Sequence, residues 1–221
     1  MARAADTANP RRRAPQADNG PRSAWFEPCI HSTYFQIFAG LLAARGLTAP
    51  RTYTGAARLM PLLDCLPLID TLDVPLDARA GEEVGHAIAG AAHGAMGLAA
   101  MTSATLLDAM HTVARYAPIR NRMFDYRCAQ EDGMAVLRMP TRIPLGGYQT
   151  FLQAATLHAV FNVFRAVLDE AALRQAQLCV PWPASASPAP WQVRCRCPDL
   201  AICFPQALAE RRLASADADT H

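Results

Sequence analysis

The segment from Tyr148 to Leu173 constrains the fold of this 221-residue chain more than any other. Apolar side chains recur along it at helical spacing: Phe151, Ala154, Ala155, Leu157, Val160, Phe161, Val163, Phe164, Val167 and Leu168. They cover more than one face of the expected helix, and a helix of that kind has to be buried. We therefore expect a helix that lies at the centre of the core or is shared between the core and a subunit interface. We further predict that it contributes to self-association.

Other segments carry the spacing and boundary signals of helices. One runs from Thr33 to Arg45 and a second from about Asp77 to Ala92. A third opens at Thr105, since Asp108 three residues later completes a capping box, and it ends before Pro118. Each presents one apolar face, so we expect all of them to pack against a shared core.

The strand signals are short and irregularly placed. Residues 123–129 and 134–139 flank Asp132-Gly133, a favoured turn sequence, and predict a β-hairpin. Alternation of apolar and polar residues predicts further strands around 178–182, 191–197 and 200–204. Helices and strands mix without regular βαβ alternation, which favours the α+β class. We expect a single domain over residues 28–221, with helices packed on a small, mostly antiparallel sheet.

Charge and composition exclude several classes of protein. Over half of the residues are hydrophobic and 18% are charged, so the chain can bury a sizeable core. All 21 basic residues are arginine, and residues 1–23 carry five of them against two aspartates, so the remainder has a net charge of about −1. A DNA-binding body normally shows a basic stripe, and we expect no direct nucleic-acid binding by the folded part.

The first 27 residues are rich in Arg, Pro and Ala, which predicts a flexible tail; an Arg-rich arm that contacts nucleic acid is the alternative. No apolar run follows the early arginines as in a secretory signal, and apolar stretches are too short to cross a membrane. The seven cysteines are widely spread, which favours reduced thiols and a cytoplasmic protein without membrane contact.

The middle of the chain carries an ordered series of motifs. They are His93-Gly94, Met96-Gly97-Leu98-Ala99, Met101-Thr102-Ser103-Ala104-Thr105-Leu106 and Ala114-Arg115-Tyr116. The series resembles the central signature of the N-terminal, arabinose-binding-like domain of AraC/XylS-type bacterial transcription regulators. Segments around Ser32–Phe35, Ala43–Leu47, Glu131–Gly133 and Phe204–Leu208 are similar to the same domain.

The resemblance implies a domain that binds a small-molecule effector and dimerises. In that family the sensor domain leads into a DNA-binding domain with helix-turn-helix units, whereas this chain ends at His221, where the linker would start. We therefore expect a homodimer, or a mixed dimer with a full-length relative whose activity it alters. A truncated gene product is the other interpretation.

Four residues near the signature are candidates for ligand binding: His93, Arg115, Tyr116 and Arg120. A guanidinium matches a carboxylate in a bidentate pair, so Arg115 suits an acidic effector. The alternatives are structural: His93 fixes the turn at Gly94, and Arg115 caps its helix or pairs with Glu131 or Asp132. The pocket itself should be mostly apolar.

The runner-up function is a Cys-dependent metal- or haem-binding protein. Cys195 and Cys197 would point to one face of an extended strand, and Cys203 follows closely. Cysteines in a strand more often act as small core residues. His86 and His93, seven residues apart, lack the i,i+4 spacing typical of helical metal ligands. No catalytic motif or phosphate loop occurs, so we expect neither an enzyme nor a cofactor.

Overall fold

The computed structural model describes residues 23–49, 57–183 and 190–216. The elements follow in this order: η2 (Ser23–Phe26), β1 (Pro28–His31), α1 (Ser32–Ala44), β2 (Leu59–Pro61), α2 (Leu62–Asp70), α3 (Ala78–Ala87), η3 (Gly90–His93), α4 (Ala95–Met101), α5 (Leu106–Tyr116), η4 (Ala117–Ile119), β3 (Arg127–Glu131), β4 (Met134–Met139), η5 (Gly146–Tyr148), α6 (Gln149–Arg165), α7 (Glu170–Leu173), β5 (Gln177–Cys179), β6 (Gln192–Arg194), β7 (Leu200–Pro205) and α8 (Gln206–Ala209). This mixture confirms the α+β class.

The main sheet has the strand order β3-β4-β7-β5-β6. Adjacent strands in this sheet are antiparallel, except for the parallel pair β5 and β6. The prediction of a mostly antiparallel sheet is therefore confirmed. The hairpin β3–β4 turns at Asp132 and Gly133, whose φ angles of 49° and 74° match the tight turn predicted there. Strands β1 and β2 form a separate antiparallel pair.

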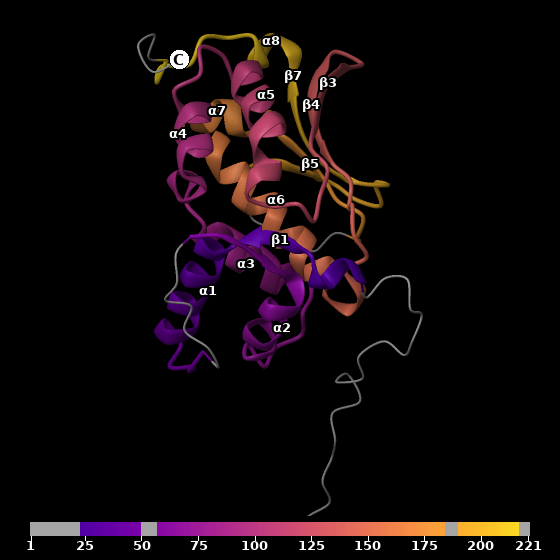
Figure 1. The fold of residues 1–221 in the computed structure, drawn as a ribbon. Helices are drawn as coiled ribbons and strands as arrows, with labels where there is room; N and C mark the ends of the chain where they lie inside the picture. Colours follow the sequence, from indigo (N-terminus) through magenta and orange to yellow (C-terminus); the bar gives the residue numbers. More distant parts are fainter. Residues whose placement is uncertain (1–22, 50–56, 184–189, 217–221) are drawn as a thin grey trace, which may run out of the picture.

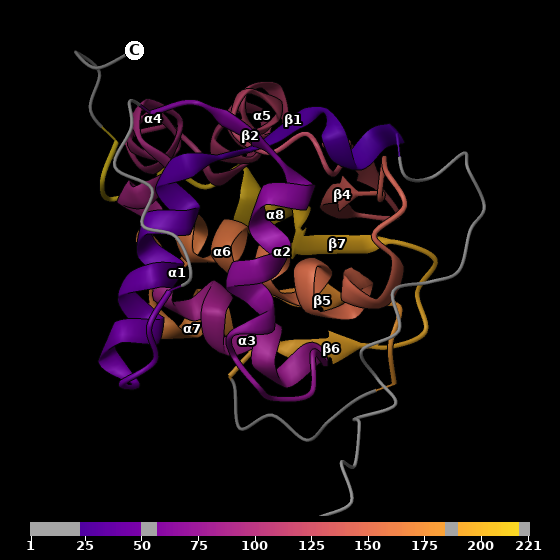
Figure 2. The same cartoon turned by 60° about the horizontal axis from the view of Figure 1, so that its bottom comes forward.

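Helix α6 lies at the centre of the molecule, between the sheet and the N-terminal helices (Figures 1 and 2). Thirteen of its 17 residues are buried. The inner face of the sheet packs toward it through Leu137, Ile202 and Phe204, which belong to the same core. Of the two roles predicted for this helix, the central one is therefore right. The contribution of this segment to self-association stays a prediction, and the burial of residues 151–164 leaves mainly the two ends of the segment exposed for such a contact.

The central helix is also shorter than the apolar pattern indicated. It ends at Arg165, and α7 begins separately at Glu170 rather than continuing the same helix to Leu173. The Asp169 side chain accepts a hydrogen bond from the Ala172 backbone N–H at 2.7 Å and starts the new helix. Apolar spacing continued across this boundary, so periodicity alone did not reveal it.

Helix α3 packs against α6 at unusually close range. Gly81 and Gly85 are buried on its inner side, where an added Cβ would collide with the α6 backbone at Phe151 and Ala155, respectively. The helix ends at Ala87 instead of the predicted Ala92. There the Asn162 side-chain amide donates to the carbonyls of Gly85, His86 and Ile88 at 2.8–3.2 Å. These bonds satisfy the His86 and Ile88 carbonyls at the helix end and add to the Gly85 carbonyl, which also accepts from the Ile88 N–H.

Two other predicted helices are confirmed almost residue for residue. Helix α1 covers 32–44, and α5 begins at Leu106 behind its Thr105 cap. The Thr105 hydroxyl accepts from the Asp108 N–H at 3.1 Å and donates to the Asp108 carboxylate at 2.7 Å. The first bond is the N-cap interaction that the sequence motif predicts, whereas the Asp108 carboxylate bonds the Thr105 hydroxyl instead of the Thr105 backbone N–H.

Most of the predicted tail, residues 1–22, lies outside the described residues. Its last part forms the short 3-10 helix η2, and Trp25 Nε1 donates to the Pro144 carbonyl at 2.6 Å. The Trp25 ring also meets Tyr148 edge-on, with centroids 6.3 Å apart. Contact with the domain thus begins before residue 28. Within the described part of the chain, no helix has both the length and the apolar surface needed to cross a bilayer.

Candidate ligand-binding cavity

A cavity lies where the N-terminal helices meet α6. Its wall comes from α1, α2, α3 and α6 together with the segment after α5, and it is predominantly apolar, with Phe38, Ile69, Val84 and Phe151 among its lining residues. The space open to the centres of water-sized molecules is about 90 Å³. One water needs only about 10–15 Å³ on the same measure, so the cavity has room for a small organic molecule.

One polar group in the wall is already occupied by internal hydrogen bonds. His93 is 3% exposed; its Nε2 lies 3.0 Å from the Ala159 carbonyl and its Nδ1 2.7 Å from the Tyr34 hydroxyl. A carbonyl only accepts, so Nε2 holds the proton and Nδ1 accepts from Tyr34. Burial lowers the pKa of His93 to about 4, so the ring is neutral at pH 7. His93 thereby connects α1, η3 and α6, rather than simply fixing the Gly94 turn.

Tyr126 is the polar group without a protein partner. Its side chain lines the cavity and is 9% exposed, yet its hydroxyl makes no hydrogen bond to any residue that the structure describes. Desolvation raises the pKa of Tyr126 well above its ordinary value, so the group stays a neutral O–H donor. Buried tyrosine hydroxyls usually find a partner. The arrangement therefore leaves a donor available to a molecule in the cavity.

Two further polar side chains share the wall with Tyr126. The Asn121 amide donates to the Thr156 hydroxyl at 3.4 Å, which is a long hydrogen bond, and both residues line the cavity. Asn121 Oδ1 meanwhile accepts from the Met123 N–H at 3.0 Å. The Thr156 hydroxyl and the Asn121 amide can thus bind a ligand with little loss of protein hydrogen bonding.

Arg120 lies behind this wall. Its guanidinium carbon is 5.4 Å from the centre of the Tyr34 ring, and one of its terminal nitrogens donates to the Ala92 carbonyl at 3.3 Å. Its Nε is buried without a hydrogen-bond partner among the described residues. Arg120 does not itself line the cavity, but it contacts Tyr34, which does.

The structure separates the other two predicted ligand residues from the cavity. Arg115 and Tyr116 are exposed at the end of α5, with the Arg115 guanidinium carbon 5.3 Å from the Tyr116 ring centre. Glu131, one proposed partner of Arg115, instead accepts from Arg138 Nε at 3.1 Å. Of the four candidates, only His93 lines the cavity, with Arg120 directly behind it. Sequence reasoning missed Tyr126, which the predicted hairpin placed within its first strand, 123–129, whereas β3 begins one residue later, at Arg127.

The alternative thiol site does not form as predicted. Strand β6 ends at Arg194, and Arg196 takes a positive φ of 58°, so Cys195 and Cys197 do not share a strand face. Cys195 packs against the main core, whereas Cys197 packs with Cys179 and Cys203 on the opposite face of the sheet. Cys179 and Cys203 lie 3.9 Å apart at their sulfur atoms. In the described structure these cysteines pack against apolar side chains on the two faces of the sheet.

By its fold and its cavity, this chain is an α+β domain with a mostly apolar pocket. The chain belongs to the family described as the arabinose-binding domain of AraC transcription regulators, N-terminal, whose model matches residues 39–213. This confirms the resemblance found in the motifs around His93.

A solved structure has the same fold, the transcriptional regulator CdpR from Pseudomonas aeruginosa. It is 14% identical, with a TM-score of 0.66, and the match covers 85% of this chain and 59% of that one. The chain thus corresponds to about three-fifths of the length of that regulator. The comparison with curated proteins finds no match.

Proposed function

We propose that this domain is a non-catalytic sensor that binds a small-molecule effector in the cavity and couples that event to dimerisation. The observation that carries the proposal is the Tyr126 hydroxyl, which has no hydrogen-bond partner among the described residues and lies in a wall that is mostly apolar. Apolar pockets with a few convergent polar groups are the usual form of small-molecule sites. Family membership supports a regulatory role rather than catalysis.

The lining indicates what kind of effector fits. Most of the wall is apolar, so the effector needs an apolar body whose burial supplies affinity. Its polar end should be a carbonyl, carboxylate or hydroxyl oxygen that accepts from Tyr126 and reaches Asn121 or Thr156. A free sugar fits poorly, because most of its hydroxyls would be buried without partners.

We expect Tyr126→Phe to weaken effector binding about tenfold without lowering the stability of the free domain. A net hydrogen bond contributes about 0.5–1.5 kcal/mol, and the free protein loses none when this hydroxyl is removed. A thermal-shift screen of small acids, ketones and amino-acid derivatives would supply the effector, since a ligand of the native state raises the melting temperature. Calorimetry would then compare its affinity for the two proteins.

Tyr34→Phe is the matched control for that substitution. It removes a hydroxyl that donates to His93, so the free domain should lose about 1 kcal/mol of stability. Should Tyr126→Phe bind the effector as tightly as the parent does, the hydroxyl is not part of the site. Should the screen yield no ligand at all, the sensor role itself is contradicted.

Dimerisation is the second half of the proposal, with a second copy of the chain or with a full-length relative as the partner. Because α6 is covered within one chain, we expect the contact to use the exposed surface of other helices or of the sheet. Light scattering at micromolar concentration, with and without effector, measures this directly. We expect a dimer that does not bind duplex DNA at physiological salt. A strict monomer under both conditions would contradict the coupling.

We also propose that the protein works in the cytoplasm. All seven cysteines are free thiols in the structure, and several are buried among apolar side chains. Burial raises the pKa of Cys29 and of Cys128 to about 11 each, which keeps both as unreactive thiols at neutral pH. Such thiols suit a reducing compartment.

A further inference from the structure

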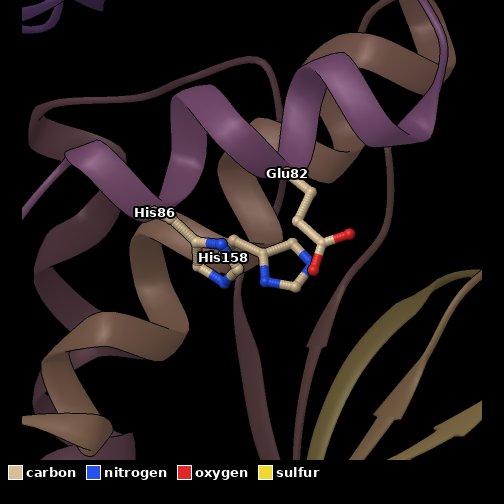
Figure 3. Close-up of side chains that lie close together, drawn as sticks. All are labelled: Glu82, His86 and His158. Atoms are coloured by element: carbon tan, nitrogen blue, oxygen red, sulfur yellow. The ribbon is translucent and has the colours of Figure 1, made fainter. Parts of the chain in front are cut away.

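A cluster of three potential metal ligands lies outside the cavity, at the contact between α3 and α6 (Figure 3). Glu82 and His86 project from α3 one helical turn apart, and His158 projects toward them from α6. One ligand atom from each side chain can be chosen so that all three atoms lie within 4.8 Å of one another. That separation is close to what a single bound ion requires.

The close packing of the two helices creates this cluster. Gly85 lies directly before His86, and an added Cβ there would be 2.8 Å from the His158 Cβ. With glycines on the inner side of α3, His158 emerges beside the i,i+4 pair of Glu82 and His86. This spacing is the one that places two side chains on the same helix face.

His158 has a polar atom that the protein leaves unsatisfied. The residue is 6% exposed, and its Nδ1 is buried without a hydrogen-bond partner in the described part of the chain. Its Nε2 is 3.9 Å from the Glu82 carboxylate, too far for a hydrogen bond. A buried, unpaired nitrogen costs about 1–3 kcal/mol. No group in the described structure offsets that cost, whereas a bound cation would offset it by accepting the lone pair of an imidazole nitrogen.

We propose that Glu82, His86 and His158 bind a divalent transition-metal ion of the zinc type. Two imidazole nitrogens and one carboxylate oxygen are a donor set that Zn²⁺ and its first-row neighbours accept, with water completing the coordination. His86 is exposed and Glu82 partly exposed, so the ion and its water have access from solvent.

The protonation states of the two histidines favour metal binding, whereas one nearby positive charge opposes it. Burial lowers the pKa of His158 to about 3 and also lowers that of His86, so both rings are neutral near pH 7. Arg165 is the nearby cation. It donates to Asn162 Oδ1 at 3.1 Å and lies 5.1 Å from the centre of the Trp191 ring. Its charge acts on both His86 and His158 and therefore lowers the affinity of the site for a cation.

A metal here would fasten α3 to α6, the two helices that contribute Val84 and Ala155 to the cavity wall. Metal binding would therefore stabilise the native domain, because the three ligands come together only on folding. The inference does not depend on effector binding, since no ligand residue of the cluster lines the cavity.

Cobalt(II) titration of the full, untagged chain tests the site, because the absorption of bound Co²⁺ reports its ligands. We expect one Co²⁺ per chain with a spectrum of nitrogen and oxygen ligands, displaced by Zn²⁺. Glu82→Gln and His86→Gln change solvent-accessible side chains and should fold. Each should weaken binding at least about tenfold, the lower end of the loss seen even for residues that only support a metal ligand.

His111→Gln is the matched control, since His111 is an exposed histidine on α5 outside the cluster. It should bind Co²⁺ as the parent does. A second readout is Trp191, whose ring lies 6.3 Å from that of His86 and should be quenched by bound Co²⁺. The proposal is overturned if the parent binds no metal, if the two cluster variants bind as tightly as the parent, or if the spectrum shows thiolate ligation.

Discussion

Replacing Gly81 with alanine is expected to destabilise the domain by about 2 kcal/mol. The new Cβ would collide with the Phe151 carbonyl oxygen and lie 2.8 Å from the Ala154 Cβ, both of which belong to α6. Overpacking of this kind costs about 1–3 kcal/mol, and more where the obstacle is backbone that cannot rotate away. The better helix propensity of alanine, worth about 1 kcal/mol, recovers only part of that cost.

Gly40→Ala is the same chemical change, but we expect it to raise the stability of the domain instead of lowering it. Gly40 is an exposed residue inside α1, and an added Cβ would meet nothing within 4 Å. Alanine there should stabilise the domain by about 0.5–1 kcal/mol, because it restricts the unfolded chain. Urea denaturation of the three proteins measures both effects. If the two variants changed stability in the same direction, close packing of α3 on α6 would not be the cause.

Phe161→Ala should cost about 3–5 kcal/mol, the range for removing a buried aromatic ring. Phe161 is fully buried in the C-terminal half of α6. Its ring meets Trp191 edge-on with centroids 5.0 Å apart and stacks with Phe204 at 6.3 Å. Those two contacts join α6 to β7 and to the segment before β6. Since a whole domain is stable by only about 5–15 kcal/mol, this loss would remove a large fraction of the free energy of unfolding.

Phe26→Ala is the control for ring loss, because Phe26 is 63% exposed in η2. A surface change of this kind should alter the free energy of unfolding by no more than about 0.5 kcal/mol. Thermal and urea unfolding of both variants would provide the comparison. A cost below about 1 kcal/mol for Phe161→Ala would mean that α6 is not the centre of the core.

Features set by neighbouring residues were accessible from the sequence. The Thr105 cap and the Asp132-Gly133 turn both depend on contacts within a few residues, and both were predicted at the right positions. The end of α3 was placed too late, because it coincides with hydrogen bonds from Asn162, which lies more than 70 residues away. Periodicity within a segment contains no information about such a partner.

The candidate sites were harder to predict for the same reason. His93 was identified from a motif. The Tyr126 hydroxyl is free because no distant part of the described fold places a hydrogen-bond acceptor beside it, which sequence alone cannot show. The i,i+4 pair of Glu82 and His86 was visible in the sequence, yet it becomes a potential metal site only through His158 on another helix. Cys195 and Cys197 were assigned to one strand face because the left-handed turn at Arg196 was not anticipated.

The strand order has a consequence for how the chain folds during synthesis. The strand at the middle of the sheet is β7, which pairs with both β4 and β5 although it leaves the ribosome last of all the strands. Until it emerges, β4 and β5 each present an open edge to other chains, and such edges invite aggregation. The nascent domain therefore depends on its last strand to complete the sheet. A chain that stops before Leu200 would keep both strand edges open, and we expect chaperones to bind it and proteases to degrade it.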